Sequence, residues 1–269
     1  MTFAERYGPW ALVTGAGNGL GAEFGRQLAA RGLDVVLVDI DGAGLARVAA
    51  EISAAGRKVR TVAADLAQAD FMEAVAAATA GLDIGLLVNN AGITTIGLFL
   101  ERSIEQHLKV ADLNVRAPLM LTHAYAPALA ARGRGGILFV CSMSGLQGTA
   151  YVASYAATKA QNLILAEGLW QELRAQGVDV TGCLLGTTRT PGFVNSRPQL
   201  ERAGAIPIME MAPTVREALD ALGRGPRQVV GRLNRLINFV LQHLLPQRRL
   251  IELVSRSTTA LYGPRGERN

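Results

Sequence analysis

The sequence has few residues of the kinds that build covalent or metal-bound scaffolds. It contains only two cysteines in 269 residues, Cys141 and Cys183, and each lies inside an apolar run. Two separate thiols cannot form a disulfide framework, so we expect both to be buried and free. The three histidines, His107, His123 and His243, follow no metal-ligand spacing. We therefore predict that the protein holds no metal.

Long apolar segments and concentrated charge are also missing. No apolar run reaches the length of a membrane-spanning helix, and the first residues lack the basic and then apolar pattern of a secretion signal, so we expect a cytoplasmic protein. The net charge is +5, but the basic residues are spread along the chain without an accompanying aromatic array. No nucleic-acid partner is therefore predicted. The content of 49% hydrophobic and 18% charged residues is typical of a globular enzyme.

Short apolar runs alternate with longer segments that have the composition of helices. The runs that we interpret as strands lie at 10–13, 34–38, 58–62, 84–88, 136–140 and 178–184, with a last short strand at 228–231. Segments rich in alanine and leucine lie between them, for example at 23–31, 43–55 and 104–132. Several runs are apolar throughout, as in strands that are covered on both faces. The alternation predicts an α/β fold, a Rossmann-type doubly wound parallel sheet with helices on both faces, in a single domain over residues 1–269.

Two segments late in the chain have more than one interpretation. The segment at 190–214 combines prolines and glycines with large apolar residues such as Ile206 and Met209. A lid over an apolar pocket and ordinary helical packing explain it equally well. Over 232–262, arginines alternate with leucines at helical spacing, which predicts basic amphipathic helices. For these helices we favour packing on their own domain over a contact between subunits, and a membrane-surface role is the least favoured.

The pair Tyr155 and Lys159 is the first sign of chemistry. The two residues lie four apart in an alanine-rich segment that is expected to be helical, so they share one face. A phenol is a poor base at neutral pH, but a fixed positive charge beside it stabilises the phenolate. The pair can therefore carry a proton. Taken alone it is weak evidence, because this spacing is more often part of a solvated helix face.

Glycines cluster between the first predicted strand and the helix that follows it. Gly15, Gly19 and Gly21 allow the backbone to approach a phosphate, and a helix N-terminus adds unpaired N–H groups. Asp39 ends the second strand, where its carboxylate would accept hydrogen bonds from ribose hydroxyls and repel a 2′-phosphate. The alternative for Asp39 is a helix cap.

In their order and spacing, these and other motifs resemble the short-chain dehydrogenase/reductase family over about residues 8–190. The matching motifs are the glycines of 15–21, Asp65-Leu66, Asn89-Asn90-Ala91-Gly92, Asn114, Ser142, Tyr155 and Lys159. Two positions depart from the family pattern. Leu185 stands where a proline is usual, which leaves the start of the lid less defined, and Cys141 stands where a serine is common. Neither change removes a catalytic group.

The resemblance implies catalytic roles for Asn114, Ser142, Tyr155 and Lys159. Ser142 would hydrogen-bond the substrate oxygen, and Tyr155 would exchange a proton with it. Lys159 would hold the nicotinamide ribose and support Tyr155, while Asn114 would hold a water that links Lys159 to solvent. The resemblance also suggests a homodimer or homotetramer built on the long helices around Asn114 and Tyr155.

The same resemblance implies which residues line the binding site. The expected cofactor residues are Gly15, Asn18, Gly19, Leu20, Gly21, Asp39, Ile40, Asp65, Leu66, Asn90, Ala91, Gly92, Tyr155, Lys159, Gly186, Thr188 and Thr190. The expected substrate residues are Thr94, Ser142, Ser144, Gln147, Tyr155 and Thr187. Because Asp39 is acidic and neither Asn18 nor Ile40 is basic, we predict NAD in preference to NADP.

The function predicted from the sequence is an NAD-dependent oxidoreductase that interconverts a secondary alcohol and a ketone by hydride transfer. The apolar residues of 190–214 favour an apolar or ring-bearing substrate, such as a hydroxysteroid, an aryl alcohol or a lipid-like ketone. Two alternatives stay open. One is a non-catalytic dinucleotide-binding protein, and the other is a dehydratase or epimerase on the same fold.

Overall fold

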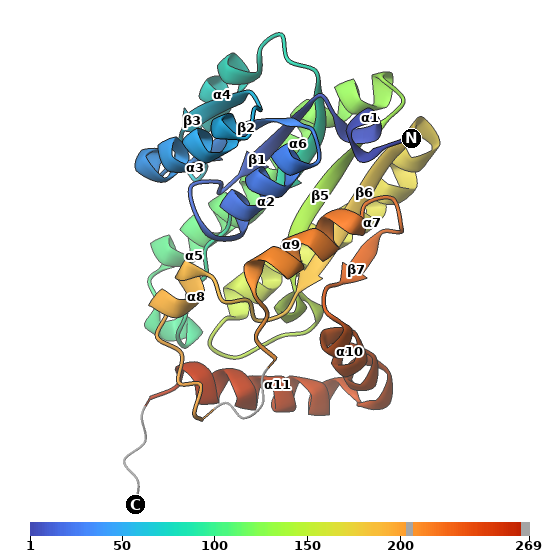
Figure 1. Ribbon diagram of the computed structural model, residues 1–269. Coiled ribbons are helices and arrows are strands. Elements are labelled where there is room, and N and C mark those ends of the chain that lie inside the picture. Colours follow the sequence, from blue (N-terminus) through green and yellow to red (C-terminus); the bar gives the residue numbers. More distant parts are fainter. Residues whose placement is uncertain (203–206, 265–269) are drawn as a thin grey trace, which may run out of the picture.

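The centre of the fold is a seven-stranded parallel sheet with strand order β3-β2-β1-β4-β5-β6-β7. The computed structural model describes residues 1–202 and 207–264, and the sheet runs through its middle (Figure 1). The strands are β1 (Trp10–Thr14), β2 (Asp34–Asp39), β3 (Val59–Ala63), β4 (Ile84–Asn89), β5 (Gly135–Ser142), β6 (Val178–Leu185) and β7 (Arg227–Val229). The predicted Rossmann-type sheet is confirmed. Its strand order reverses between β1 and β4, the point where open sheets of this kind bind ligands.

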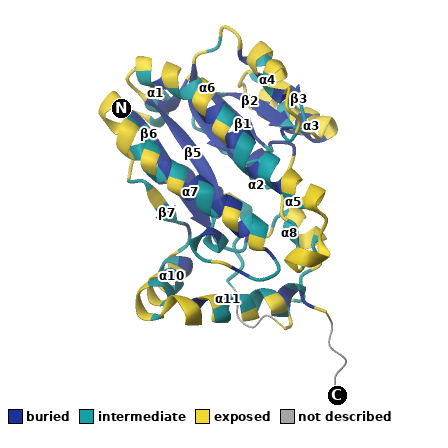
Figure 2. Ribbon diagram, turned by 180° about the vertical axis from the view of Figure 1, so that it is seen from behind, coloured by how far each residue is buried: buried dark blue, intermediate teal, exposed yellow. Residues whose placement is uncertain are grey.

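Helices cover both faces of the sheet, and each face has its own apolar core. Successive residues of a strand point to opposite faces, so Val13 packs in one core and Leu12 in the other, both 0% exposed. Figure 2 shows the central strands as buried and the helices as buried only along their inner sides, whereas the edge strands β3 and β7 are partly exposed. One face carries α2 (Gly19–Ala30), α3 (Gly42–Ala54) and α9 (Met211–Asp220), and the other carries α4 (Phe71–Thr79), α6 (Ala117–Ala131) and α7 (Ala153–Leu173). The short helix α1 (Phe3–Tyr7) precedes β1.

The helical segment that we predicted at 104–132 is divided by a π-helical turn. Helix α5 (Ile104–Ala111) is followed by this turn at Asp112–Arg116 and then by α6. Pro118 explains why the regular pattern cannot continue, because a proline has no N–H to donate to the carbonyl four residues earlier. That carbonyl belongs to Asn114 and instead accepts a hydrogen bond of 2.8 Å from Nδ2 of Asn162 on α7. A π-helical turn at this place is a common mark of a functional site.

The segment at 190–214, which we interpreted either as a lid or as ordinary packing, begins with one helix and ends in another. Its first part forms the short helix α8 (Pro191–Asn195), and its last part begins α9 at Met211. Met209 packs against the core beneath α9 and pairs with Thr188 in an isolated β-bridge, so this part is ordinary packing. Residues 203–206 of the predicted lid, which include Ile206, lie outside the described residues.

Two helices follow β7 at the end of the chain, α10 (Arg232–Leu244) and α11 (Gln247–Tyr262). They confirm the helices predicted over 232–262. Figure 1 shows both helices below one end of the strands, at the bottom of the view, with α11 running across that end of the sheet. Among residues 1–202 and 207–264, every helix is too short or too polar to cross a membrane.

Replacement of Phe139 on β5 tests the core at the strand that ends in Ser142. Phe139 is 0% exposed, so Phe139→Ala should leave a cavity and lower the free energy of unfolding by about 3–5 kcal/mol. Leu100→Ala is the control, because Leu100 is 93% exposed and its truncation should change stability little. Urea denaturation followed by circular dichroism measures both variants. Equal stability of the two would contradict this description of the core.

Candidate active site

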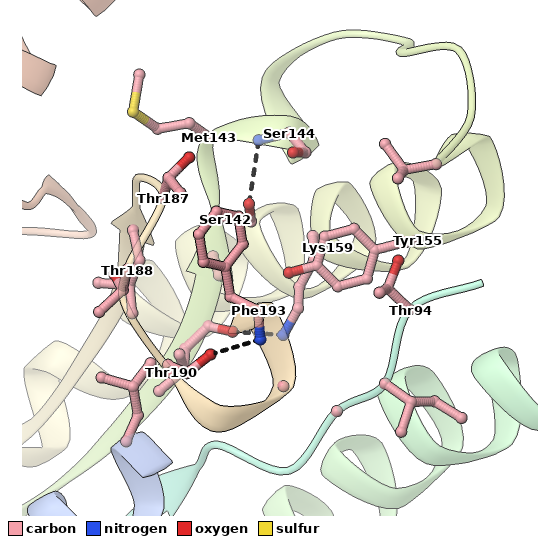
Figure 3. A pocket seen from close by; sticks show the side chains of 18 of the residues that line it. Thr94, Ser142, Met143, Ser144, Tyr155, Lys159, Thr187, Thr188, Thr190 and Phe193 are labelled. Atoms are coloured by element: carbon pink, nitrogen blue, oxygen red, sulfur yellow. Dashed lines mark hydrogen bonds between the residues drawn. The ribbon is translucent and has the colours of Figure 1, made fainter. Parts of the chain in front are cut away.

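A cavity of about 1060 Å³ lies at the carboxyl ends of the strands. The loops after β1, β4, β5 and β6 form most of its wall, and α10 and α11 close it from the other side. Figure 3 shows how the side chains after β5 and β6 and those of α7 converge on it. Every predicted cofactor and substrate residue lines this cavity. Among the predicted site residues, Asn114 alone lies behind the wall.

The glycine loop between β1 and α2 has the geometry of a phosphate cradle. Gly15 and Gly19 have φ angles of +65° and +56°, which favour glycine. A Cβ on Gly21 would lie 1.9 Å from the carbonyl oxygen of Gly15, so the loop closes only without a side chain there. Asn18 makes no side-chain cap, which leaves the first N–H groups of α2 available to an anion. These features fit the pyrophosphate of a dinucleotide.

Two carboxylates line the cavity, those of Asp39 and Asp65. Oδ2 of Asp39 accepts a hydrogen bond of 2.8 Å from the N–H of Gly17, and its Oδ1 accepts one of 2.9 Å from the N–H of Asp41. Asp39 is not the cap of α3, because Asp41 takes that role by accepting from the N–H of Gly44. The capping interpretation of Asp39 is therefore wrong. Asp65 lies two residues after the end of β3, where it accepts a hydrogen bond of 2.9 Å from the N–H of Ala67.

One hydroxyl joins the loops after β1 and β4. Oγ1 of Thr14 accepts hydrogen bonds of 3.0 Å from the N–H groups of both Asn90 and Ala91. In return, Nδ2 of Asn90 donates to the carbonyl of Thr14 at 2.8 Å. The motif from Asn89 to Gly92 is thus held against the glycine loop, and both sides of the cofactor groove keep a fixed spacing.

The three central catalytic candidates meet on the inner wall of the cavity. Ser142 is the last residue of β5, and its Oγ accepts a hydrogen bond of 3.2 Å from the N–H of Ser144. Tyr155 lies in the first turn of α7, and Lys159 follows one turn later with its Nζ 5.7 Å from the centre of the Tyr155 ring. Lys159 is only 5% exposed and donates a hydrogen bond of 2.7 Å to the carbonyl of Val140. Figure 3 shows Ser142, Tyr155 and Lys159 pointing into the same space.

Asn114 supports this group from behind the cavity wall. It is fully buried, its Oδ1 accepts from the N–H of Ile93, and its Nδ2 donates to the carbonyl of Ile93 and to Oγ1 of Thr158. Gly92 lies between Asn114 and Lys159. A Cβ on Gly92 would be 3.2 Å from Oδ1 of Asn114 and 3.4 Å from Nζ of Lys159. The water-holding role of Asn114 stays a prediction. Its hydrogen bonds join Ile93, which follows Gly92, to Thr158, which precedes Lys159.

The substrate side of the cavity includes residues that we did not predict. Helix α10 contributes Ile237, Asn238 and Leu241, whose spacing is that of one helix face. Nε2 of Gln242 also donates a hydrogen bond of 2.9 Å to Oε1 of the predicted residue Gln147. Further contributions come from Met143 after β5, Phe193 of α8, and the residues Val254, Ser257, Thr258, Leu261 and Tyr262 of α11. The amphipathic pattern of 232–262 was the signal for this wall, but the pattern cannot tell which part of the domain the helix covers.

Gly186, in the loop after β6, is the point where α10 packs closely against this loop. A Cβ there would lie 2.4 Å from Nδ2 of Asn234, so the glycine makes room for this buried side chain of α10. Beyond it, Thr188 and Thr190 line the cavity, and Oγ1 of Thr190 accepts a hydrogen bond of 3.1 Å from the N–H of Phe193. The residue that replaces the usual proline, Leu185, is buried in the core at 5% exposure.

The two cysteines are buried thiols and are not candidates for an acid or a base at this site. Cys141 is 2% exposed and Cys183 is 0% exposed. Burial raises the pKa of the Cys141 thiol to about 12, and it raises the pKa of Cys183 as well. In the part of the chain that the structure describes, no three His, Cys, Asp or Glu side chains are placed to hold a metal ion.

Known proteins share this sequence pattern. The short chain dehydrogenase family matches residues 9–201. A 7beta-hydroxysteroid dehydrogenase of Collinsella aerofaciens is 33% identical over 238 residues, which cover 87% of this chain and 90% of that protein. A very-long-chain 3-oxoacyl-CoA reductase of Laccaria bicolor is 35% identical over 226 residues, covering 82% of this chain and 65% of that protein. The chain therefore belongs to the short-chain dehydrogenase/reductase family of NAD(P)-dependent oxidoreductases.

Solved structures share the fold as well. A 7beta-hydroxysteroid dehydrogenase superposes with a TM-score of 0.88 at 31% identity, over 94% of this chain and 99% of that one. A short-chain dehydrogenase from Sphingobium yanoikuyae, solved with NADPH, gives a TM-score of 0.75 at 31% identity, over 88% and 94% of the two chains. The first similarity extends over nearly all of the chain, beyond the 9–201 region that the family matches.

Gly21→Ala tests the phosphate cradle. Because its Cβ would collide with the backbone of Gly15, we expect the loop to shift and the dissociation constant for the dinucleotide to rise by about 100-fold. Gly168→Ala is the matched control, since a Cβ there meets no atom within 4 Å on the exposed side of α7. Calorimetric titration with NAD and with NADP measures both variants. An unchanged affinity in Gly21→Ala would show that the dinucleotide does not use this loop.

Proposed function

We propose that this protein is an NAD-dependent dehydrogenase/reductase that interconverts a secondary alcohol and a ketone on an uncharged, ring-bearing substrate of steroid size. The observation that carries the proposal is the position of Ser142, Tyr155 and Lys159. They line one cavity together with the glycine loop on one side and with uncharged residues of α10 and α11 on the other.

The proposed mechanism assigns a separate task to each side chain. When bound, the nicotinamide supplies or accepts the hydride at the substrate carbon. Oγ of Ser142 donates a hydrogen bond to the substrate oxygen, which places that oxygen beside the Tyr155 hydroxyl. Tyr155 then gives a proton to the oxygen during reduction, or takes one during oxidation. Lys159 holds its positive charge near the Tyr155 ring and offers its ammonium to the nicotinamide ribose.

The side chains around the substrate support an uncharged molecule. Among the described residues that line the cavity, the only carboxylates are Asp39 and Asp65 in the cofactor groove, and the only cation is Lys159. The substrate half is lined by apolar side chains and by neutral amides and hydroxyls. Transfer of an unpaired carboxylate or phosphate into such a site is unfavourable. This favours a steroid-like alcohol or ketone over a coenzyme A ester, whose phosphates would need cationic partners.

The similarity to 7beta-hydroxysteroid dehydrogenases points the same way. The match to one such structure extends over 94% of this chain, beyond residues 9–201 and therefore into the part of the chain that contains α10 and α11. The panel that tests the substrate class pairs neutral hydroxysteroids with aryl alcohols and with 3-hydroxyacyl coenzyme A esters. We expect NADH to appear in equal amount to the ketone product with the hydroxysteroids. Turnover of the coenzyme A esters alone would overturn the proposed class.

Tyr155→Phe tests the chemistry itself. Loss of the hydroxyl should lower kcat by about 10²- to 10⁴-fold, because the substrate oxygen loses its proton partner, while NAD affinity stays unchanged. Tyr125→Phe is the control, since Tyr125 does not line the cavity and its hydroxyl hydrogen-bonds Oγ1 of Thr79 at 2.7 Å. A Tyr155→Phe enzyme that retains most of its turnover would refute the mechanism. Product formation without any change in NADH would favour a dehydratase or epimerase, and absence of turnover with every substrate would favour a non-catalytic protein.

Asp39 is the basis for NAD in preference to NADP. Its carboxylate borders the adenosine end of the groove, where a 2′-phosphate would meet a like charge at a cost of about 1–4 kcal/mol. The nearby guanidinium of Arg47 donates to the carbonyl of Gly17 at 2.9 Å and lies outside the cavity lining. Asp39→Asn keeps an oxygen for the Gly17 N–H but removes the charge.

We expect the wild type to have a higher kcat/KM with NAD, and Asp39→Asn to lose roughly tenfold of this preference. Steady-state rates with both cofactors measure it. Asp65→Asn serves as the comparison, because it removes a carboxylate from the same groove at a different place. A wild-type preference for NADP would contradict the assignment of the cofactor.

A further inference from the structure

Helix α10 has two apolar faces. Its inner face contains the buried Asn234 and the cavity residues Ile237 and Leu241. Its outer face carries five large apolar side chains between 40% and 67% exposed, at positions that follow one helical stripe. They are Leu233, Leu236, Phe239, Val240 and Leu244, which we call the α10 outer face. Figure 2 shows this side of α10 as exposed. Packing on its own domain, the role favoured from the sequence, therefore accounts only for the inner face.

Positive charges outnumber negative ones around the α10 outer face. Between Asp220 and Glu252 the sequence contains six arginines and no acidic residue. Arg232 begins α10, and Arg248 and Arg249 follow its end with side chains 90% and 74% exposed. Glu252 is the carboxylate that contacts these two arginines, and Arg235 pairs with Glu217 below the helix. The apolar stripe is thus flanked at both ends by cations.

This charge distribution decides which partner fits. In a symmetric dimer built on this face, the same patch of both copies would meet, and basic ends would lie near basic ends. Like charges at such short range oppose association. A surface of anionic headgroups over an apolar layer instead complements both features, because the arginines would meet phosphates and the stripe would enter the acyl boundary.

We propose that the α10 outer face docks the protein on the surface of an anionic phospholipid membrane. The helix lies parallel to that surface, with Leu236 and Phe239 inserted and Arg232, Arg248 and Arg249 on the headgroups. Insertion is shallow, since the opposite face of the same helix remains the wall of the cavity. This docking goes beyond the proposed reaction and does not depend on it.

Vesicle co-sedimentation tests the proposal with two lipid compositions, phosphatidylcholine alone and phosphatidylcholine mixed with phosphatidylglycerol. We expect binding to the anionic vesicles, weaker binding to the neutral ones, and a decrease with added salt. Leu236→Ser/Phe239→Ser should reduce the partition by about tenfold or more, and Arg248→Gln/Arg249→Gln should remove the preference for anionic lipid.

The control variant is Leu98→Ser/Phe99→Ser, which removes two apolar side chains that are 44% and 55% exposed and lie outside both α10 and the cavity lining. It should bind vesicles like the wild type. Circular dichroism and NAD titration confirm that each variant is folded. Failure of the wild type to bind anionic vesicles, or equal losses in the control, would overturn the proposal. A concentration-dependent dimer that dissociates in Leu236→Ser/Phe239→Ser would instead show that a second copy covers this face.

Discussion

The hydrogen bonds of Asn114 are the interaction on which the rest of the active centre depends. Pro118 cannot donate to the carbonyl of Asn114, and this carbonyl is therefore free to accept from Asn162 on α7. The side chain of the same residue bonds both backbone groups of Ile93 and the hydroxyl of Thr158. One buried residue thus connects the chain after β4 to two successive turns of α7. Because Tyr155 and Lys159 belong to that helix, their depth and rotation relative to the cavity wall follow from these bonds.

The sequence alone predicts those parts of the fold that depend on residues close together in the chain. Continuous apolar runs predicted six strands to within a few residues, and the glycine spacing of 15–21 predicted the turn that opens α2, because each depends on neighbours in the chain. The π-helical turn was missed although Pro118 was visible, since its stability comes from Asn162, more than forty residues later. The inner face of α10 was missed for a similar reason. Its apolar pattern shows that it must be covered, but only the fold places Asn234 against Gly186 and Leu241 against the cavity.

The distribution of charge separates the inside of the site from the outside of the molecule. The protein carries a net charge of +5, yet the described lining of the substrate half is neutral. The arginines of the last two helices face solvent, and the carboxylates of the cavity stay in the cofactor groove. A neutral lining suits an uncharged molecule, because a buried charge there would find no oppositely charged partner, whereas the two carboxylates oppose further negative charge in their part of the cavity. The two parts of one cavity therefore differ in the charge that they favour in a bound molecule.

The cysteine that precedes Ser142, the predicted catalytic serine, affects how the protein responds to oxidants. Cys141 precedes Ser142 on β5, but burial keeps its sulfur protonated at any physiological pH. Oxidants and alkylating reagents attack the thiolate, so this strand offers them no target while the protein is folded. Cys183, the other sulfhydryl of the chain, is equally enclosed. Peroxide or glutathione stress should therefore leave both cysteines of the folded protein unmodified.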